Sequence, residues 1–160
     1  RNRVRNAWAD IDVQLKRRHD LVPNLVAVVE GYAIHEKTTL EDITRLRVKA
    51  EGANKIDDID GAETELTGAL KSLFAIAESY PNLRADANFR QLQTQLAEIE
   101  DNIQYARRYY NAVVRDMNIK REIFPSNIIA SAFGFEKPEY FQAEADEREP
   151  VAANFNGNEN

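Results

Sequence analysis

Apolar residues recur along this chain at alternating steps of three and four positions, in four separate stretches. The last stretch is the longest and runs from Phe89 to Met117. A strand cannot keep that spacing, whereas one face of an α-helix keeps it over many turns. The pattern predicts a helix over residues 85–123, which at about 1.5 Å per residue is about 60 Å long.

The three earlier stretches predict three further helices, each with one apolar stripe. Two of their starts carry a local signal: Thr38 with Glu41, and Asp60 with Glu63, have the spacing of capping boxes. Gly52 and the turn-forming residues after it separate the second helix from the third. The expected bounds are residues 1–36, 38–54 and 60–80.

The first helix departs from a simple apolar stripe at two positions. Pro23 lies inside it, but the stripe keeps its phase on both sides, so we predict one kinked helix rather than two. Arg18 is the single polar residue on the stripe. With Asp12 it forms a candidate structural polar cluster. We expect either that Glu98 or Asp101 of the last helix meets the Arg18 guanidinium, or that the Arg18 stem extends past the core and carries the charge into water. Such a contact more often fixes helix register than performs chemistry.

These stripes together predict the fold class. No single helix can bury its own stripe, and short connections favour antiparallel neighbours, so we expect an all-α, up-and-down antiparallel four-helix bundle. A chain of 160 residues is long enough for one domain with one core. Beyond the bundle we expect a short apolar capping helix over 125–135 and an acidic, loosely ordered tail over 136–160.

The stretch "KREIFPSNIIASAFGF" raises a separate question, because it is strongly apolar although the chain is acidic. Pro125 ends the long helix, and Gly134 ends the short helix that follows. We favour a plug that folds back over the open end of the bundle. The alternative is a docking patch for a partner or a membrane, since large exposed apolar patches mark contact sites. The candidate patch comprises Phe124, Ile128, Ile129, Phe133 and Phe135.

Composition and motifs exclude several functions. The net charge of -6 argues against nucleic acid as a partner, because neutralising phosphates needs a basic face. Without cysteine there is no thiolate chemistry. His19 and His35 lack the Glu-x-x-His spacing of di-iron bundles, so we expect both at the surface or at helix ends and predict no metal. No nucleotide-binding or nucleophile motif occurs, and we predict no cofactor and no catalytic residue.

Five blocks of sequence together resemble the LemA family of bacterial and archaeal proteins. They cover nearly all of residues 6–135 and read "NAWADIDVQLKRRHDLVPNLV", "GYAIHEKTTLE", "YPNLRADANFRQLQTQLAEIEDNI", "YNAVV" and "FPSNIIASAFGF". The resemblance implies a bundle related in topology to bromodomain-like bundles. It also implies a single apolar anchor helix just before the first long helix. Relatives are associated with magnetosome membranes or occur beside membrane proteases, which implies scaffold or adaptor work rather than catalysis.

With such an anchor, the chain would be a single-pass membrane-associated protein. Arg1, Arg3 and Arg5 are then candidate membrane-proximal residues, since basic side chains favour anionic lipid headgroups. The family pattern of a short basic segment before the anchor favours an extracytoplasmic position for the helical domain.

Three functional hypotheses follow. The first is a non-enzymatic, membrane-associated scaffold that docks protein partners through its helices. The second is self-assembly of this chain into a homo-oligomer or filament. The third is a ligand-binding or enzymatic bundle with a polar pocket between helices, lined by Asp12 and Arg18.

Overall fold

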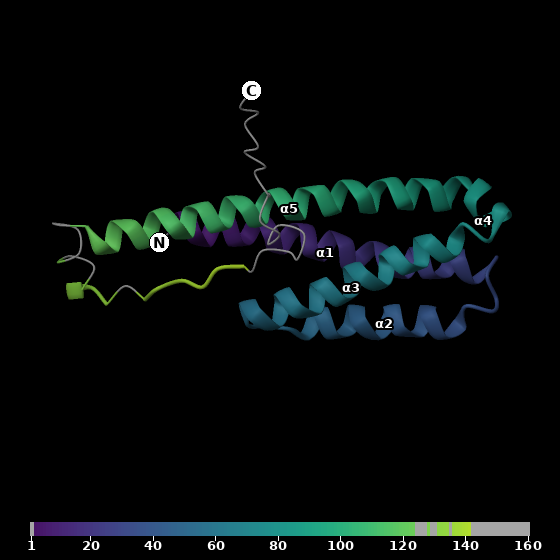
Figure 1. Cartoon of the computed structure of the whole chain (residues 1–160), viewed down its shortest axis with the longest axis horizontal. Helices are drawn as coiled ribbons and strands as arrows, with labels where there is room; N and C mark the ends of the chain where they lie inside the picture. Colours follow the sequence, from purple (N-terminus) through teal and green to yellow (C-terminus); the bar gives the residue numbers. More distant parts are fainter. Residues whose placement is uncertain (1, 124–127, 129–130, 135, 142–160) are drawn as a thin grey trace, which may run out of the picture.

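The structure of this chain is a computed structural model that describes residues 2–123, 128, 131–134 and 136–141. It confirms the all-α class, and the described residues contain no strand. Their helices are α1 (Asn2–Glu30), α2 (Lys37–Gly52), α3 (Ile56–Ala77), α4 (Pro81–Ala85) and α5 (Ala87–Glu122). Figure 1 shows α1 and α5 lying side by side in opposite directions, with the shorter α2 and α3 alongside only part of their length.

α1 is one continuous helix through Pro23, as the unbroken stripe predicts. Proline has no N–H, so the carbonyl of His19, four residues earlier, loses its helical donor. Arg47 of α2 supplies a replacement, because its Nε donates to the His19 carbonyl oxygen over 2.8 Å. The break in the hydrogen-bond ladder of α1 is therefore one of the points where α2 is attached.

The capping-box predictions for α2 and α3 are wrong. α2 begins at Lys37, and its N-cap residue makes no side-chain capping bond, so Thr38 and Glu41 lie inside the first turns. α3 begins at Ile56, four residues before the expected cap at Asp60. Glu63 is then not a capping residue but a buried one. The packing of α3 against the other helices buries Glu63. The capping-box spacing between Asp60 and Glu63 therefore does not indicate the role of this residue.

The end of the molecule at the α1–α2 connection is closed by hydrogen bonds from two tyrosines. The chain reaches this end through the short α4, whose first residue is Pro81. Proline is tolerated there because the first N–H groups of a helix have no partner within the helix. Asp86 then caps α5 by accepting from the backbone N–H of Phe89 over 2.9 Å. The same carboxylate accepts from Tyr32 over 2.7 Å, and Tyr80 donates to Glu36 over 2.9 Å.

The core consists of two clusters of buried side chains that lie at different levels along the long helices. One cluster, centred on Leu25, Ile43 and Leu66, includes residues of all five helices. The other joins the first half of α1 to the second half of α5, where Ile11 and Val114 are buried. Of the shorter helices only the first turn of α3 reaches this second level, through Ile56 and Ile59. Another segment must therefore cover the rest of the two long helices (Figure 1).

That segment is residues 136–141, which we call the strap, and it corrects the expectation of a loose tail for this part of the chain. Phe141 is only 4% exposed. Its ring stacks on Trp8 at 5.5 Å and meets the edge of Tyr110 at 5.5 Å. The side chain of Asn111 donates to the Phe141 carbonyl and accepts from its N–H, at 3.1 and 3.0 Å. A side-chain amide thus holds the strap through its backbone.

The predicted plug, in contrast, does not fold back at the positions that the structure describes. Ile128 is helical but 60% exposed, and Phe133 is 76% exposed. Gly134 adopts a left-handed φ of 59°, which suits the end of a short helix. The long helices are covered instead by the strap, whose single buried aromatic ring gives no periodic signal in the sequence.

Candidate functional site

Arg18 is the centre of the chain's most heavily bonded polar cluster. It lies at mid-length in α1 and is 1% exposed. Its Nη2 pairs with the Glu63 carboxylate and also donates to the Glu63 carbonyl oxygen at 3.2 Å. Its Nη1 donates to Glu100 of α5 at 2.7 Å and to Thr67 of α3 at 2.6 Å. One guanidinium therefore connects three helices.

Glu63 has a second partner on α1. The His19 Nε2 lies 2.6 Å from the Glu63 Oε1, so the two carboxylate oxygens are shared between neighbouring side chains of one helix. Burial alone would raise the pKa of this carboxyl. The hydrogen bond with His19 and the charge of Arg18 outweigh burial, and the pKa of Glu63 is lowered from its usual value. The carboxylate is therefore held in its ionised, paired form.

A second ion pair adjoins the first. Arg107 of α5 pairs with Asp60 of α3, and both side chains are largely buried. The Arg107 guanidinium also lies over the Phe141 ring, with its Cζ 4.9 Å from the ring centroid, which is a cation–π geometry. The polar cluster and the strap are thus in direct contact.

A cavity of about 10 Å³ adjoins these groups and is lined by residues of α1, α3, α5 and the strap. That volume has room for about one water molecule. The Nε of Arg18 is buried without a partner among the described residues. Within the same part of the chain, no group of three or more acidic, histidine or cysteine side chains has metal-binding geometry.

The predicted site residues are only partly brought together. Arg18 is buried on its stripe as expected, but Asp12 is exposed and is not among its partners. Neither Glu98 nor Asp101 meets the guanidinium, since Glu100 takes that place. The prediction that His19 lies at the surface is wrong, because this imidazole is buried against Glu63.

Sequence reasoning missed Glu63 as a partner of Arg18. The one available signal was its position directly after Ala62, on the border of the apolar stripe of α3. A charged stripe residue on α1 requires a charged partner at the same level, and Glu63 is an acidic residue that a small rotation of α3 turns inward.

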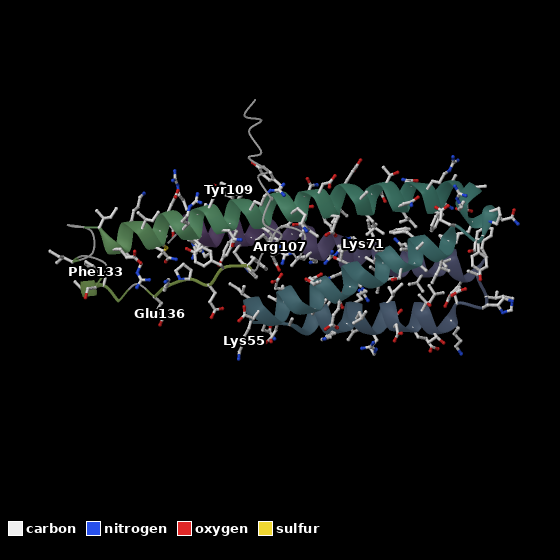
Figure 2. The ribbon with its side chains drawn as sticks, in the orientation of Figure 1. Lys55, Lys71, Arg107, Tyr109, Phe133 and Glu136 are labelled. Carbon is white, nitrogen blue, oxygen red and sulfur yellow. The ribbon has the colours of Figure 1, made fainter. Side chains whose placement is uncertain are left out.

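The other candidates gather at the end of the molecule where α1 begins and α5 ends. Arg3 and Arg5 are exposed in the first turns of α1. Ile128 is exposed beyond the end of α5, and so is Phe133, which Figure 2 labels there. The remaining candidates lie outside the described residues and are Arg1, Phe124, Ile129 and Phe135.

The chain matches known sequences over almost its whole length. The sequence model of the LemA family matches residues 7–155. The protein LemA of Metamycoplasma hominis is 30% identical over 155 residues, which are 94% of this chain and 69% of that protein. The magnetosome protein MamQ 2 of Paramagnetospirillum magneticum is 28% identical, and MamQ of Magnetospirillum gryphiswaldense is 26% identical.

The two magnetosome relatives are longer than this chain. The match covers 84% of the chain and 59% of MamQ 2, and 83% of the chain and 58% of the second MamQ. Among the residues that the structure describes, no helix combines the length and the apolar character that a bilayer span requires.

Proposed function

The chain belongs to the LemA family, and we propose that it is the rigid, non-catalytic interaction scaffold of a membrane-associated member. The observation that carries this proposal is the Arg18 cluster. Its guanidinium and the Glu63 carboxylate bond to one another across helices, and the cavity beside them is only about 10 Å³. Groups arranged in this way hold helices in register.

The same cluster argues against an enzyme that uses these residues. A general acid or base works best with a pKa near the working pH. The pKa of Glu63 is lowered instead, and both of its oxygens are engaged by Arg18 and His19. A space for one water molecule has no room for a substrate beside them.

Outside the cluster, the chain presents long helices with charged and scattered apolar side chains. Val13 of α1, Val48 of α2 and Tyr105 of α5 are each more than half exposed. Such faces suit helix-on-helix docking of protein partners. We place the end with Arg3 and Arg5 towards the membrane, because basic side chains favour anionic headgroups.

The test is photo-crosslinking in membranes of cells that produce the complete protein. A photoreactive residue at Val13 or at Tyr105 is expected to capture defined protein partners. The same residue at Phe89, which is buried, is the matched control and should capture none. The Glu63→Gln variant, if folded, should capture the same partners as the unsubstituted protein. The scaffold proposal fails if the two exposed positions capture no more than Phe89 does, or if the purified chain turns over a substrate.

A further inference from the structure

Exposed apolar side chains are concentrated at one end of this molecule. We call this end the tip and define it by the last turns of α5 together with Ile128 and Phe133. Ile119 on α5 and Ile123 directly after it are exposed there to about half of their surface. At the opposite end only Ile34 and Tyr32, both in the connection between α1 and α2, are exposed large apolar residues among those described.

Basic side chains lie at the tip and on the first turns of α1, which begins short of the end of α5 (Figure 1). The last turns of α5 carry Arg115, Lys120 and Arg121, and the first turns of α1 carry Arg3 and Arg5. Residues 2–5 and 115–123 together hold five basic and two acidic side chains, a local charge of +3 in a chain of net charge -6. The strap holds two acidic and one basic side chain, so including it lowers the local charge from +3 to +2.

This combination has a specific chemistry. Isoleucine and phenylalanine partition into the boundary between lipid headgroups and acyl chains, and lysine and arginine favour a surface with anionic lipids. An acidic protein would match the charges but gives no reason for large apolar groups at the extreme end of a rod. We propose that the tip binds directly to an anionic lipid surface, with Phe133 and Ile128 inserted at the headgroup level and Lys120 and Arg115 at the phosphates.

The expected binding is weak on its own. A few partly inserted side chains and a charge excess of +2 to +3 act as one membrane-binding signal. A single signal of this size gives marginal, reversible binding. A covalent anchor in the same membrane raises the effective concentration, so the tip then stays bound for much of the time. The rod would consequently be held at a fixed angle to the membrane. This inference rests on the membrane side of the proposed function and deepens it, yet it concerns a property that these 160 residues have by themselves.

The test measures binding of the purified 160-residue chain to vesicles by co-sedimentation. Vesicles of phosphatidylcholine mixed with phosphatidylglycerol should bind the chain, and vesicles of phosphatidylcholine alone should bind it at least several-fold less. In the Ile128→Ser/Phe133→Ser variant the partition coefficient should fall about tenfold. The matched control is Ile34→Ser, which removes an equally exposed apolar side chain, 74% accessible, from the opposite end and should leave binding unchanged.

Charge is tested in the same way. Lys120→Glu should weaken binding several-fold, whereas Lys71→Glu makes the same change of net charge on α3 (Figure 2) and should have a smaller effect. Because the chain has no cysteine, Phe133→Cys and Ile34→Cys can each carry a polarity-sensitive dye. The dye at position 133 should report an apolar environment on anionic vesicles, and the dye at position 34 should not.

Several results would overturn the proposal. They are absence of binding to anionic vesicles, equal binding to neutral ones, equal losses in the two serine variants, or a dye signal at position 34 only. Unchanged vesicle binding in the Ile128→Ser/Phe133→Ser variant, together with loss of self-association in sedimentation, would assign the tip to a second copy of this chain. None of these results bears on the partners captured at Val13 and Tyr105, so the scaffold proposal is tested separately.

Discussion

Removing the Glu63 carboxylate is the most direct way to test the role of the buried cluster. In Glu63→Leu, the Arg18 guanidinium loses its closest ion-pair partner while it remains 1% exposed. His19 loses the carboxylate at 2.6 Å as well. Breaking a buried pair from one side costs about 3–5 kcal/mol, because one charge is left without compensation. Arg18 keeps its contacts to Glu100 and Thr67, so we expect a loss of about 3 kcal/mol, at the lower end of that range.

The second half of this prediction is a rescue. Arg18→Met in addition to Glu63→Leu removes the uncompensated charge and puts apolar volume in its place, which is often neutral or stabilising. The double variant should therefore regain about 2 kcal/mol relative to Glu63→Leu. Urea unfolding followed by circular dichroism gives the free energy of unfolding of each variant, provided that the transitions are two-state and their slopes are equal.

A domain of this kind has about 5–15 kcal/mol of stability in total, so a loss of about 3 kcal/mol is easily measured. The conservative variant Glu63→Gln serves as a control, because it keeps the shape and one hydrogen-bond acceptor. If Glu63→Leu unfolds at the same urea concentration as the unsubstituted chain, the cluster does not hold the helices in register. A double variant that is less stable than Glu63→Leu would mean that the remaining bonds of Arg18 to Glu100 and Thr67 outweigh the cost of its uncompensated charge.

Three further results are expected from the same structure. Since the pKa of Glu63 is lowered on folding, its contribution is complete above the unfolded value near 4.5 and is lost as pH falls further; acid titration should therefore cost the unsubstituted chain more stability below about pH 4.5 than it costs Glu63→Gln. Phe141→Ala should cost up to about 3 kcal/mol and shift the emission of Trp8, the single tryptophan, to longer wavelength, with Phe74→Ala as a control that leaves the emission unchanged. Arg47→Met should destabilise the chain by about 1–3 kcal/mol, as expected for a buried carbonyl that loses its donor, and by clearly less in a Pro23→Ala background, where the restored N–H can bond the same carbonyl; equal losses in both backgrounds would contradict that account.

The sequence was sufficient for the four longer helices because each one repeats the same signal over several turns, whereas the five-residue α4 was not predicted. Ile11, Leu25, Ile43 and Ile103 lie on predicted stripes and are all buried. Periodicity averages over many residues, so one exception such as Arg18 does not remove it. The rotation of each helix about its own axis is a different quantity, since it depends on packing against the others. For this reason Arg18 meets Glu100 and not Glu98 or Asp101, the two partners predicted from the sequence.

The strap and the buried glutamate could not be predicted for a related reason. Phe141 follows Tyr140 in a segment with several charged residues, and nothing local distinguishes it from an exposed tail residue. Its burial depends on the unequal lengths of the helices: α5 has 36 residues and α2 only 16. The unequal helix lengths can be predicted from the sequence, and they imply that another segment packs over the ends of the long helices. The prediction that the apolar segment 125–135 covers these ends is wrong at Ile128 and Phe133, which are exposed. The prediction relied on hydrophobicity, whereas the strap is held by hydrogen bonds from Asn111.

The two levels of the molecule meet at the polar cluster, and this position explains why charges are buried there. Asp60 lies near the start of α3, where the shorter helices end and the strap takes over. Arg107 pairs with Asp60 on one side and lies over the Phe141 ring on the other, so it joins the two levels. A purely apolar junction would tolerate sliding of α3 and the strap along α1 and α5, because apolar contacts are not directional. The ion pairs of Arg18 and Arg107 fix one axial position, and a fixed axial position is compatible with the scaffold role proposed above.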